Sequence, residues 1–312
     1  MINFTGLKTG FFHPDKALKF LFTEDYVAKE LAKKKINSYF NNYKDTREYN
    51  KKKSPYFSYF DLCKRILTDS ISDESIRVRF FEDPDSLNES EISKVLEEKP
   101  DSISLAGTIW PKRAHTMIGL MKLENLQFCV EETIRNNVQG DLIETGVWKG
   151  GATIFMRIIL KKYGIKNKMV YVADSFQGLP EPDVKRFPVD AGDKHHTVDY
   201  LKISLEEVKN NFKLYGVLDE QVKFIKGYFE DTMKILPIEK ISMLRMDGDM
   251  YGSTWVVLEN LYEKLSVGGF LTVDDYDLKG AQKATDDFRK LKNIKEPIIA
   301  IDGSGTYWKK EI

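Results

Sequence analysis

From about residue 105 onward, short apolar runs alternate with amphipathic segments in a regular order. Helical periodicity predicts three helices, near residues 115–136, 152–163 and 205–214. Short apolar runs predict five strands, over residues 141–144, 169–173, 222–226, 241–246 and 270–273. This alternation is typical of a mostly parallel sheet with helices on both faces, so the chain is predicted to have an α/β fold.

The first hundred residues follow a different pattern. Helical periodicity covers residues 17–43 and 56–69, and an acidic stretch over residues 82–100 contains a short helical candidate. We therefore divide the chain into a helical N-terminal extension, residues 1–104, and an α/β domain, residues 105–312.

Aromatic residues recur at helical spacing in the extension, as in Phe22 with Tyr26 and Tyr39 with Tyr43. They could cover a substrate, or they could pack against another copy of the chain. Aromatic pairs at this spacing usually serve packing, so we favour a homo-oligomer contact.

Composition and charge narrow the class of protein. The 312 residues are 42% hydrophobic and include 48 acidic and 48 basic residues. A formal net charge of zero argues against nucleic acid as the principal partner. No apolar run approaches the length of a membrane span and the amino terminus lacks a signal-peptide core, so we expect a cytoplasmic protein without membrane insertion. Cys63 and Cys129 have no metal-ligand spacing, which predicts buried free thiols.

Two clusters of aspartates directly follow predicted strands. Asp247 and Asp249 come after residues 241–246, and Asp274 and Asp275 come after residues 270–273. The carboxyl ends of parallel strands form the ligand-binding edge of an open α/β sheet. Carboxylates that converge there repel one another unless a cation neutralises them, and Mg²⁺ is a suitable hard cation.

Helix capping is the alternative role for single aspartates in this region. Asp249 could cap a helix that begins near Ser253, and Asp277 could cap one over residues 281–291. We favour a metal site because both clusters follow strands that end at the same edge.

The first strand leads into the sequence Ile143-Glu144-Thr145-Gly146-Val147-Trp148-Lys149-Gly150-Gly151. Its glycines allow a close backbone approach to a ligand, but Trp148 departs from the dinucleotide-binding pattern G-x-G-x-x-G. Glu144 would repel a pyrophosphate and could receive an ammonium group. Asp174, at the end of the second strand, could accept hydrogen bonds from both hydroxyls of a ribose. A ribose and an amino group without a phosphate cradle indicate S-adenosylmethionine.

Four motifs stand in order along the chain: Asp141 to Ala152, Ala173 to Pro180, Arg245 to Asp249 and Val273 to Tyr276. Together they resemble the macrocin O-methyltransferase family, which includes sugar O-methyltransferases of macrolide and aminocoumarin biosynthesis. The resemblance runs from about Tyr59 to Trp308 and leaves residues 1 to about 55 outside. It implies a Rossmann-like class I methyltransferase fold, with S-adenosylmethionine and Mg²⁺ as cofactors and a sugar hydroxyl as acceptor.

The resemblance also implies roles for single residues. Asp247, Asp274 and Asp275 would be the metal ligands, and Asp249 would be a supporting or capping residue. The cofactor would contact Thr116, Met117, Glu144, Thr145, Gly146, Asp174, Ser175, Tyr228 and Phe229. Within that set, Thr116 and Met117 would lie near its methionine end, and Tyr228 and Phe229 near its adenine.

Transfer to a sugar hydroxyl requires removal of the hydroxyl proton. Two vicinal hydroxyls on Mg²⁺ would be oriented and made more acidic, and a base would take the proton. In the resembling family a histidine lies about 52 residues before the first metal aspartate, which corresponds here to His195. By itself a loop histidine indicates only surface exposure; the spacing favours His195 as the base and leaves His196 as the alternative.

The acceptor is expected to be a small molecule or glycan with vicinal hydroxyls. A catechol or another non-sugar diol would use the same metal chemistry, and a non-catalytic assembly module is a third hypothesis. Pro180, Pro182 and Pro188 exclude a continuous helix before His195 and predict a long loop above the strand ends. We expect this loop to become ordered when substrate binds.

Overall fold

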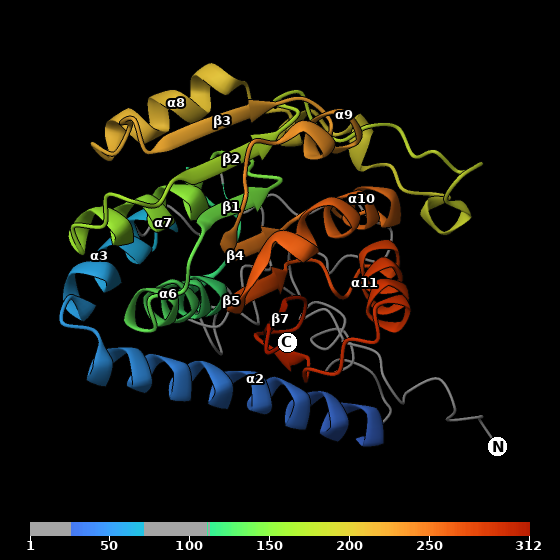
Figure 1. Cartoon of the computed structure of the whole chain (residues 1–312). Coiled ribbons are helices and arrows are strands. Elements are labelled where there is room, and N and C mark those ends of the chain that lie inside the picture. Colours follow the sequence, from blue (N-terminus) through green and yellow to red (C-terminus); the bar gives the residue numbers. More distant parts are fainter. Residues whose placement is uncertain (1–25, 72–110, 112) are drawn as a thin grey trace.

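The computed structural model describes residues 26–71, 111 and 113–312, which are coloured in Figure 1. Within these residues, the centre is a seven-stranded sheet with the strand order β3-β2-β1-β4-β5-β7-β6. The strands are β1 (Asp141–Thr145), β2 (Val170–Asp174), β3 (Val222–Lys226), β4 (Ile241–Met246), β5 (Leu265–Val273), β6 (Ile299–Ala300) and β7 (Thr306–Lys309). The predicted α/β sheet is confirmed.

Strands β1 to β5 are parallel, and β7 pairs antiparallel with both β5 and β6. From β1 the chain adds β2 and β3 on one side, whereas β4 and β5 lie on the other side. The winding direction therefore reverses between β1 and β4. In open α/β sheets this reversal creates the ligand-binding crevice at the carboxyl ends of the strands.

Helices cover both faces of the sheet (Figure 1). Helices α3, α6 and α7 pack on one face and share a core that includes Phe60, Leu126 and Phe155. Helices α10 and α11 pack on the other face around Leu258 and Phe288. The helices are α2 (Tyr26–Lys53), α3 (Phe57–Leu67), α6 (Leu120–Arg135), α7 (Gly151–Lys162), α8 (Leu205–Leu214), α9 (Phe229–Thr232), α10 (Tyr251–Leu261) and α11 (Lys279–Leu291).

The helix starts argue against the capping role for the aspartates. The N-cap residues of α10 and α11 are Met250 and Leu278, and neither makes a side-chain capping hydrogen bond. Asp249 and Asp277 each lie one residue before these positions. Asp249 is therefore available for another role at the end of β4.

Helix α2 lies along the α/β domain and contacts α6 (Figure 1). Asn50 is fully buried and donates through Nδ2 to the carbonyl oxygen (3.0 Å) and to Oε1 (2.8 Å) of Glu124. Lys64 of α3 pairs with Oε2 of the same carboxylate. One buried acid of α6 thus ties both helices to the domain. Phe22 and the acidic stretch 82–100 lie outside the described residues.

Cys63 and Cys129 are buried in α3 and α6 as free thiols, as predicted. Burial raises the pKa of both thiols, which keeps them protonated. Among the helices of the described residues, none is long and apolar enough to cross a membrane.

Candidate active site

The turn after β1 brings the ends of β1 and β4 into contact. Gly146 has a φ of +85°, and a Cβ at this position would lie 1.8 Å from the carbonyl oxygen of Asp247. A side chain would overlap that oxygen and strain the backbone, so only glycine fits. The amide of Asp247 also donates to the carbonyl oxygen of Thr145 at 2.9 Å. The two strand ends predicted to bind a cofactor and a metal ion are therefore direct neighbours.

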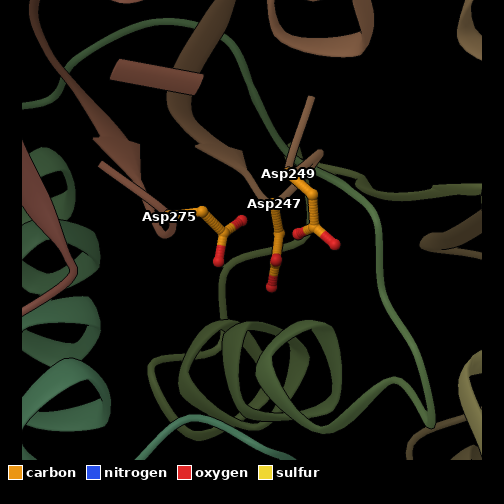
Figure 2. Close-up of side chains that lie close together, drawn as sticks. All are labelled: Asp247, Asp249 and Asp275. Carbon is orange, nitrogen blue, oxygen red and sulfur yellow. The ribbon is translucent and has the colours of Figure 1, made fainter. Parts of the chain in front are cut away.

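Asp247, Asp249 and Asp275 form a carboxylate cluster at the ends of β4 and β5 (Figure 2). Each residue offers one oxygen, and the three oxygens lie within 4.8 Å of one another. Asp249 reaches the cluster from a left-handed backbone conformation with a φ of +56°. Carboxylate oxygens at this spacing are suited to a hard divalent cation.

Asp274 lies beside the carboxylate cluster but faces two cations. Its Oδ1 accepts a hydrogen bond from Nη2 of Arg245, and its Oδ2 lies 3.0 Å from Nζ of Lys122. Lys122 is in the first turn of α6 and also donates to the carbonyl oxygen of Asp274 at 3.2 Å. The structure thus groups Asp249 with Asp247 and Asp275, and it pairs Asp274 with Arg245 and Lys122.

The electrostatics divide the four aspartates in the same way. Burial, and next the repulsion between acids, raises the pKa of Asp247 and of Asp275 well above the usual range. Burial, and next the charge of Asp247, raises the pKa of Asp249 to about 7. Burial alone would raise the pKa of Asp274, but Arg245 and Lys122 hold it below its usual range. Asp274 has two cationic partners and Asp247 shares one of them, Arg245, whereas neither Asp249 nor Asp275 pairs with a Lys or Arg among the described residues.

A cavity opens beside the carboxylate cluster at the crevice between β1 and β4. Asp247 and Asp249 line it, so the candidate cofactor and cation residues share one enclosure. Six of the predicted cofactor contacts line the cavity: Met117, Gly146, Asp174, Ser175, Tyr228 and Phe229.

Backbone amides hold Asp174 at the end of β2. Its Oδ2 accepts from the amide of Val147 and its Oδ1 from the amide of Phe176, both at 2.8 Å. Burial raises the pKa of Asp174, and these amide donors oppose the rise. The carboxylate thus joins the turns that follow β1 and β2.

The other three expected cofactor contacts are not among the residues that line the cavity. Thr116 packs where Gly151 leaves room, since a Cβ on Gly151 would lie 2.6 Å from Cβ of Thr116. Thr145 is fully buried in β1. Glu144 is buried against Arg245, and among the described residues its Oε2 has no hydrogen-bond partner. Burial raises the pKa of Glu144 to about 8, although Arg245 opposes the rise.

The loop over residues 177–201 contributes a further wall of the cavity. It contains three short 3₁₀ helices and no continuous helix, as predicted. Phe187 packs against Tyr251 of α10 with their ring centroids 5.5 Å apart. Asp190 is buried and accepts from the amides of Tyr251 (2.7 Å) and Gly252 (3.0 Å).

Asp190 therefore caps α10 from a distant part of the chain. Gly280 makes room for it, since a Cβ there would lie 2.7 Å from Oδ1 of Asp190. Neither Asp190 nor Phe187 was predicted from the sequence to belong to the site; for Asp190 the reason is that a capping residue normally lies directly before its helix. The only local signal is an aspartate inside a loop that is rich in proline.

Replacing Asp190 by alanine is expected to detach the loop from α10. The amides of Tyr251 and Gly252, which are partly buried, would lose their acceptor, at a cost of about 1 kcal/mol each. We expect faster tryptic cleavage within residues 177–201, measured by mass spectrometry of timed digests. Asp183→Ala is the control, because it replaces an exposed acid of the same loop. Trypsin should cleave this variant at the wild-type rate. Equal rates for the two variants would contradict the anchoring role of Asp190.

His195 lies next to the carboxylate cluster. Its Nδ1 is 2.8 Å from Oδ2 of Asp193 and 3.8 Å from Oδ2 of Asp249, and its amide donates to Oδ1 of Asp193 at 2.9 Å. Asp193 therefore orients the imidazole beside the acids. The neighbouring His196 differs, because its Nδ1 is buried without a hydrogen-bond partner among the described residues.

Comparison with known proteins identifies the family of this chain. The model of the macrocin-O-methyltransferase family matches residues 57–310, which is most of the sequence. The chain belongs to the macrocin-O-methyltransferase family. It is 42% identical over 257 residues to the demethyldecarbamoylnovobiocin O-methyltransferase of Streptomyces niveus, a match that covers 81% of this chain and 93% of the relative. It is 43% identical over 256 residues to the mycinamicin III 3''-O-methyltransferase of Micromonospora griseorubida, a match that covers 81% of this chain and 96% of that relative.

Solved structures agree with this family assignment. The fold matches that of the O-methyltransferase NovP with a TM-score of 0.72 and 40% identity, covering 81% of this chain and 98% of NovP. The calicheamicin methyltransferase CalS11 shares the fold alone, at 15% identity and a TM-score of 0.52. Membership of the macrocin-O-methyltransferase family confirms the predicted fold class and makes the chain an O-methyltransferase, which implies S-adenosylmethionine as methyl donor. Helix α2 precedes the matched region.

Proposed function

We propose that this protein transfers a methyl group from S-adenosylmethionine to a sugar hydroxyl whose neighbouring hydroxyl is bound to Mg²⁺. One observation carries the proposal: the cavity lined by Gly146 and Asp174 continues to Asp247 and Asp249. A methyl donor and a metal-bound acceptor would then lie side by side, which is the orientation that group transfer requires.

The turns after β1 and β2 suit S-adenosylmethionine, which supplies a methyl group on a positively charged sulfur. Asp174 would accept hydrogen bonds from the ribose, and Tyr228 and Phe229 would pack against the adenine. Gly146 permits a close backbone approach. Glu144 offers a buried oxygen without a partner among the described residues, and an ammonium group would satisfy it.

The carboxylate cluster suits a divalent cation, which would make a bound hydroxyl more acidic. Oδ2 of Asp275 is buried without a hydrogen-bond partner among the described residues, as expected for an oxygen that awaits a ligand. We assign Asp247 and Asp275 to the metal. The family resemblance implied Asp274 as the third ligand. We instead favour Asp249, because its oxygen lies within 4.8 Å of the oxygens of Asp247 and Asp275.

We assign the role of base to His195. If Nδ1 donates to Asp193, Nε2 is the ring atom that accepts the proton of the sugar hydroxyl. The nearby charge of Asp249 would stabilise the imidazolium that forms. Asp193 thus fixes the tautomer and the ring orientation together.

The cavity lining favours an acceptor without phosphate groups. Eight lining side chains are carboxylates, and among the described residues that line it none is Lys, Arg or His. Phosphate sites usually supply Arg or Lys, so a nucleoside diphosphate sugar would be repelled here. Leu179, Phe187 and Met250 add apolar contacts. We therefore propose a glycoside as acceptor; one relative, 42% identical, is named for methylation of a rhamnosyl tetracenomycin.

Transfer of a labelled methyl group from S-adenosylmethionine tests the proposal. The acceptor panel would contain glycosides with vicinal diols, the nucleoside diphosphate forms of the same sugars, and a catechol. We expect methylation of a glycoside with Mg²⁺ and loss of that activity in EDTA. Full turnover in EDTA would contradict the metal mechanism, and methylation of the catechol alone would contradict a sugar acceptor.

A further inference from the structure

We propose that Arg245 is a positioning residue that sets the cofactor carboxylate and the metal carboxylates with a single guanidinium group. The proposal rests on the function proposed above. Arg245 lies in β4, and only 4% of its side chain is exposed. Nη1 donates to Oε1 of Glu144 and to Oδ2 of Asp247 (2.9 Å), and Nη2 donates to Oδ1 of Asp274. One side chain thus joins the ends of β1, β4 and β5.

The register of the sheet explains this convergence. Arg245 is paired with Glu144 on β1 and with Thr272 on β5. Side chains two residues apart in a strand point to the same face, so Asp247 and Asp274 follow Arg245 and Thr272 on that face. The guanidinium therefore lies among three carboxylates. Its planar guanidinium presents donors in fixed directions and can hold several carboxylates in a set geometry, whereas the ammonium of lysine is a compact point charge on a flexible stem.

The local charge makes the candidate cofactor site and the candidate metal site depend on the guanidinium of Arg245. In the described part of the chain, two cations, Arg245 and Lys122, contact acids within a group of six carboxyl groups, so acids outnumber cations here. The six are Glu144, Asp247, Asp249, Asp274, Asp275 and Asp302. Without Arg245 the side chains of Glu144 and Asp247 would lose the donor that they share, and their mutual repulsion would turn them apart. Both the ammonium contact and the metal contact would then be misplaced.

The variant Arg245→Lys tests the inference, because it keeps the charge and removes the guanidinium. We expect it to weaken two affinities at least tenfold each. The first is the affinity for S-adenosylhomocysteine, measured by calorimetry in EDTA. The second is the affinity for Mn²⁺, measured by electron paramagnetic resonance without S-adenosylhomocysteine. Glu144→Gln should weaken only the first, because Glu144 is not in the carboxylate cluster.

Arg157→Lys is the matched control. Arg157 is also a buried arginine, 5% exposed, and forms two hydrogen bonds with Asp219 at 2.9 and 2.6 Å, but it lies outside the cavity lining. The Arg157→Lys variant should have a lower melting temperature, and both of its affinities should stay within threefold of wild type.

Three results would overturn the inference. Arg245→Lys could keep either affinity within threefold of wild type, or it could lose no more affinity than Arg157→Lys does. The third is a Glu144→Gln variant that loses both affinities. These outcomes differ from failure of the proposed function. If the wild-type protein bound neither S-adenosylhomocysteine nor Mn²⁺, the proposed function itself would be wrong, and the inference that rests on it would fall too.

Discussion

Asparagine in place of Asp247 is expected to abolish methyl transfer, with kcat lower by roughly 10³-fold or more. Asp247 lines the cavity, belongs to the carboxylate cluster, and contacts Arg245 at 2.9 Å. Asparagine preserves the size of the side chain and one oxygen, but it removes the charge that a divalent cation needs. Calorimetry with Mg²⁺ and steady-state rates with a methyl acceptor would measure the two losses separately.

Asp249→Asn and Asp274→Asn separate the two possible ligand sets. Asp249→Asn should weaken Mg²⁺ binding with little change in stability, because Asp249 is repelled by its acidic neighbours. Asp274→Asn should chiefly lower stability, since Arg245 and Lys122 would lose a buried partner, a change that typically costs about 3 to 5 kcal/mol. Melting curves and Mg²⁺ titrations of both variants decide the matter. If Asp274→Asn weakened Mg²⁺ binding more than Asp249→Asn did, Asp274 would be the third metal ligand in place of Asp249.

The sheet could be predicted well because burial on both faces produces continuous apolar runs. The run that became β4, Ile241–Met246, was predicted at its observed bounds, and so was β3. Strand β5 was predicted five residues too short, because Gly268 and Gly269 interrupt the apolar run before Phe270. The antiparallel pair β6 and β7 was not predicted, since β6 is only two residues long.

The candidate site was predictable only where its chemistry is local. Gly146 and Asp174 stand at strand ends, so their position in the sequence already places them at the crevice. The sequence does not show which cation neutralises which acid. Asp274 and Asp275 are adjacent, yet Lys122, 152 residues away from Asp274, helps to distinguish them. The capping role of Asp190 likewise depends on amides 61 and 62 residues away.

Alanine in place of His195 is expected to lower kcat by about 10²- to 10⁴-fold, the usual contribution of a general base. The affinity for S-adenosylhomocysteine should remain near that of wild type, because His195 is not among the residues that line the cofactor cavity. Steady-state kinetics would measure the loss of kcat, and calorimetry would measure the affinity for S-adenosylhomocysteine.

Imidazole added to the His195→Ala protein provides the sharper test. A small base that enters the vacated space should restore part of the rate in proportion to its unprotonated form, whereas a purely structural role would show no such rescue. His196→Ala is the matched control, because this neighbour lacks the contacts with Asp193 and Asp249 that orient His195. If His196→Ala lost the rate and regained it with imidazole while His195→Ala did not, the base would be His196. Asp193→Asn should cause a smaller loss, since it leaves the imidazole in place and removes only the carboxylate that orients it.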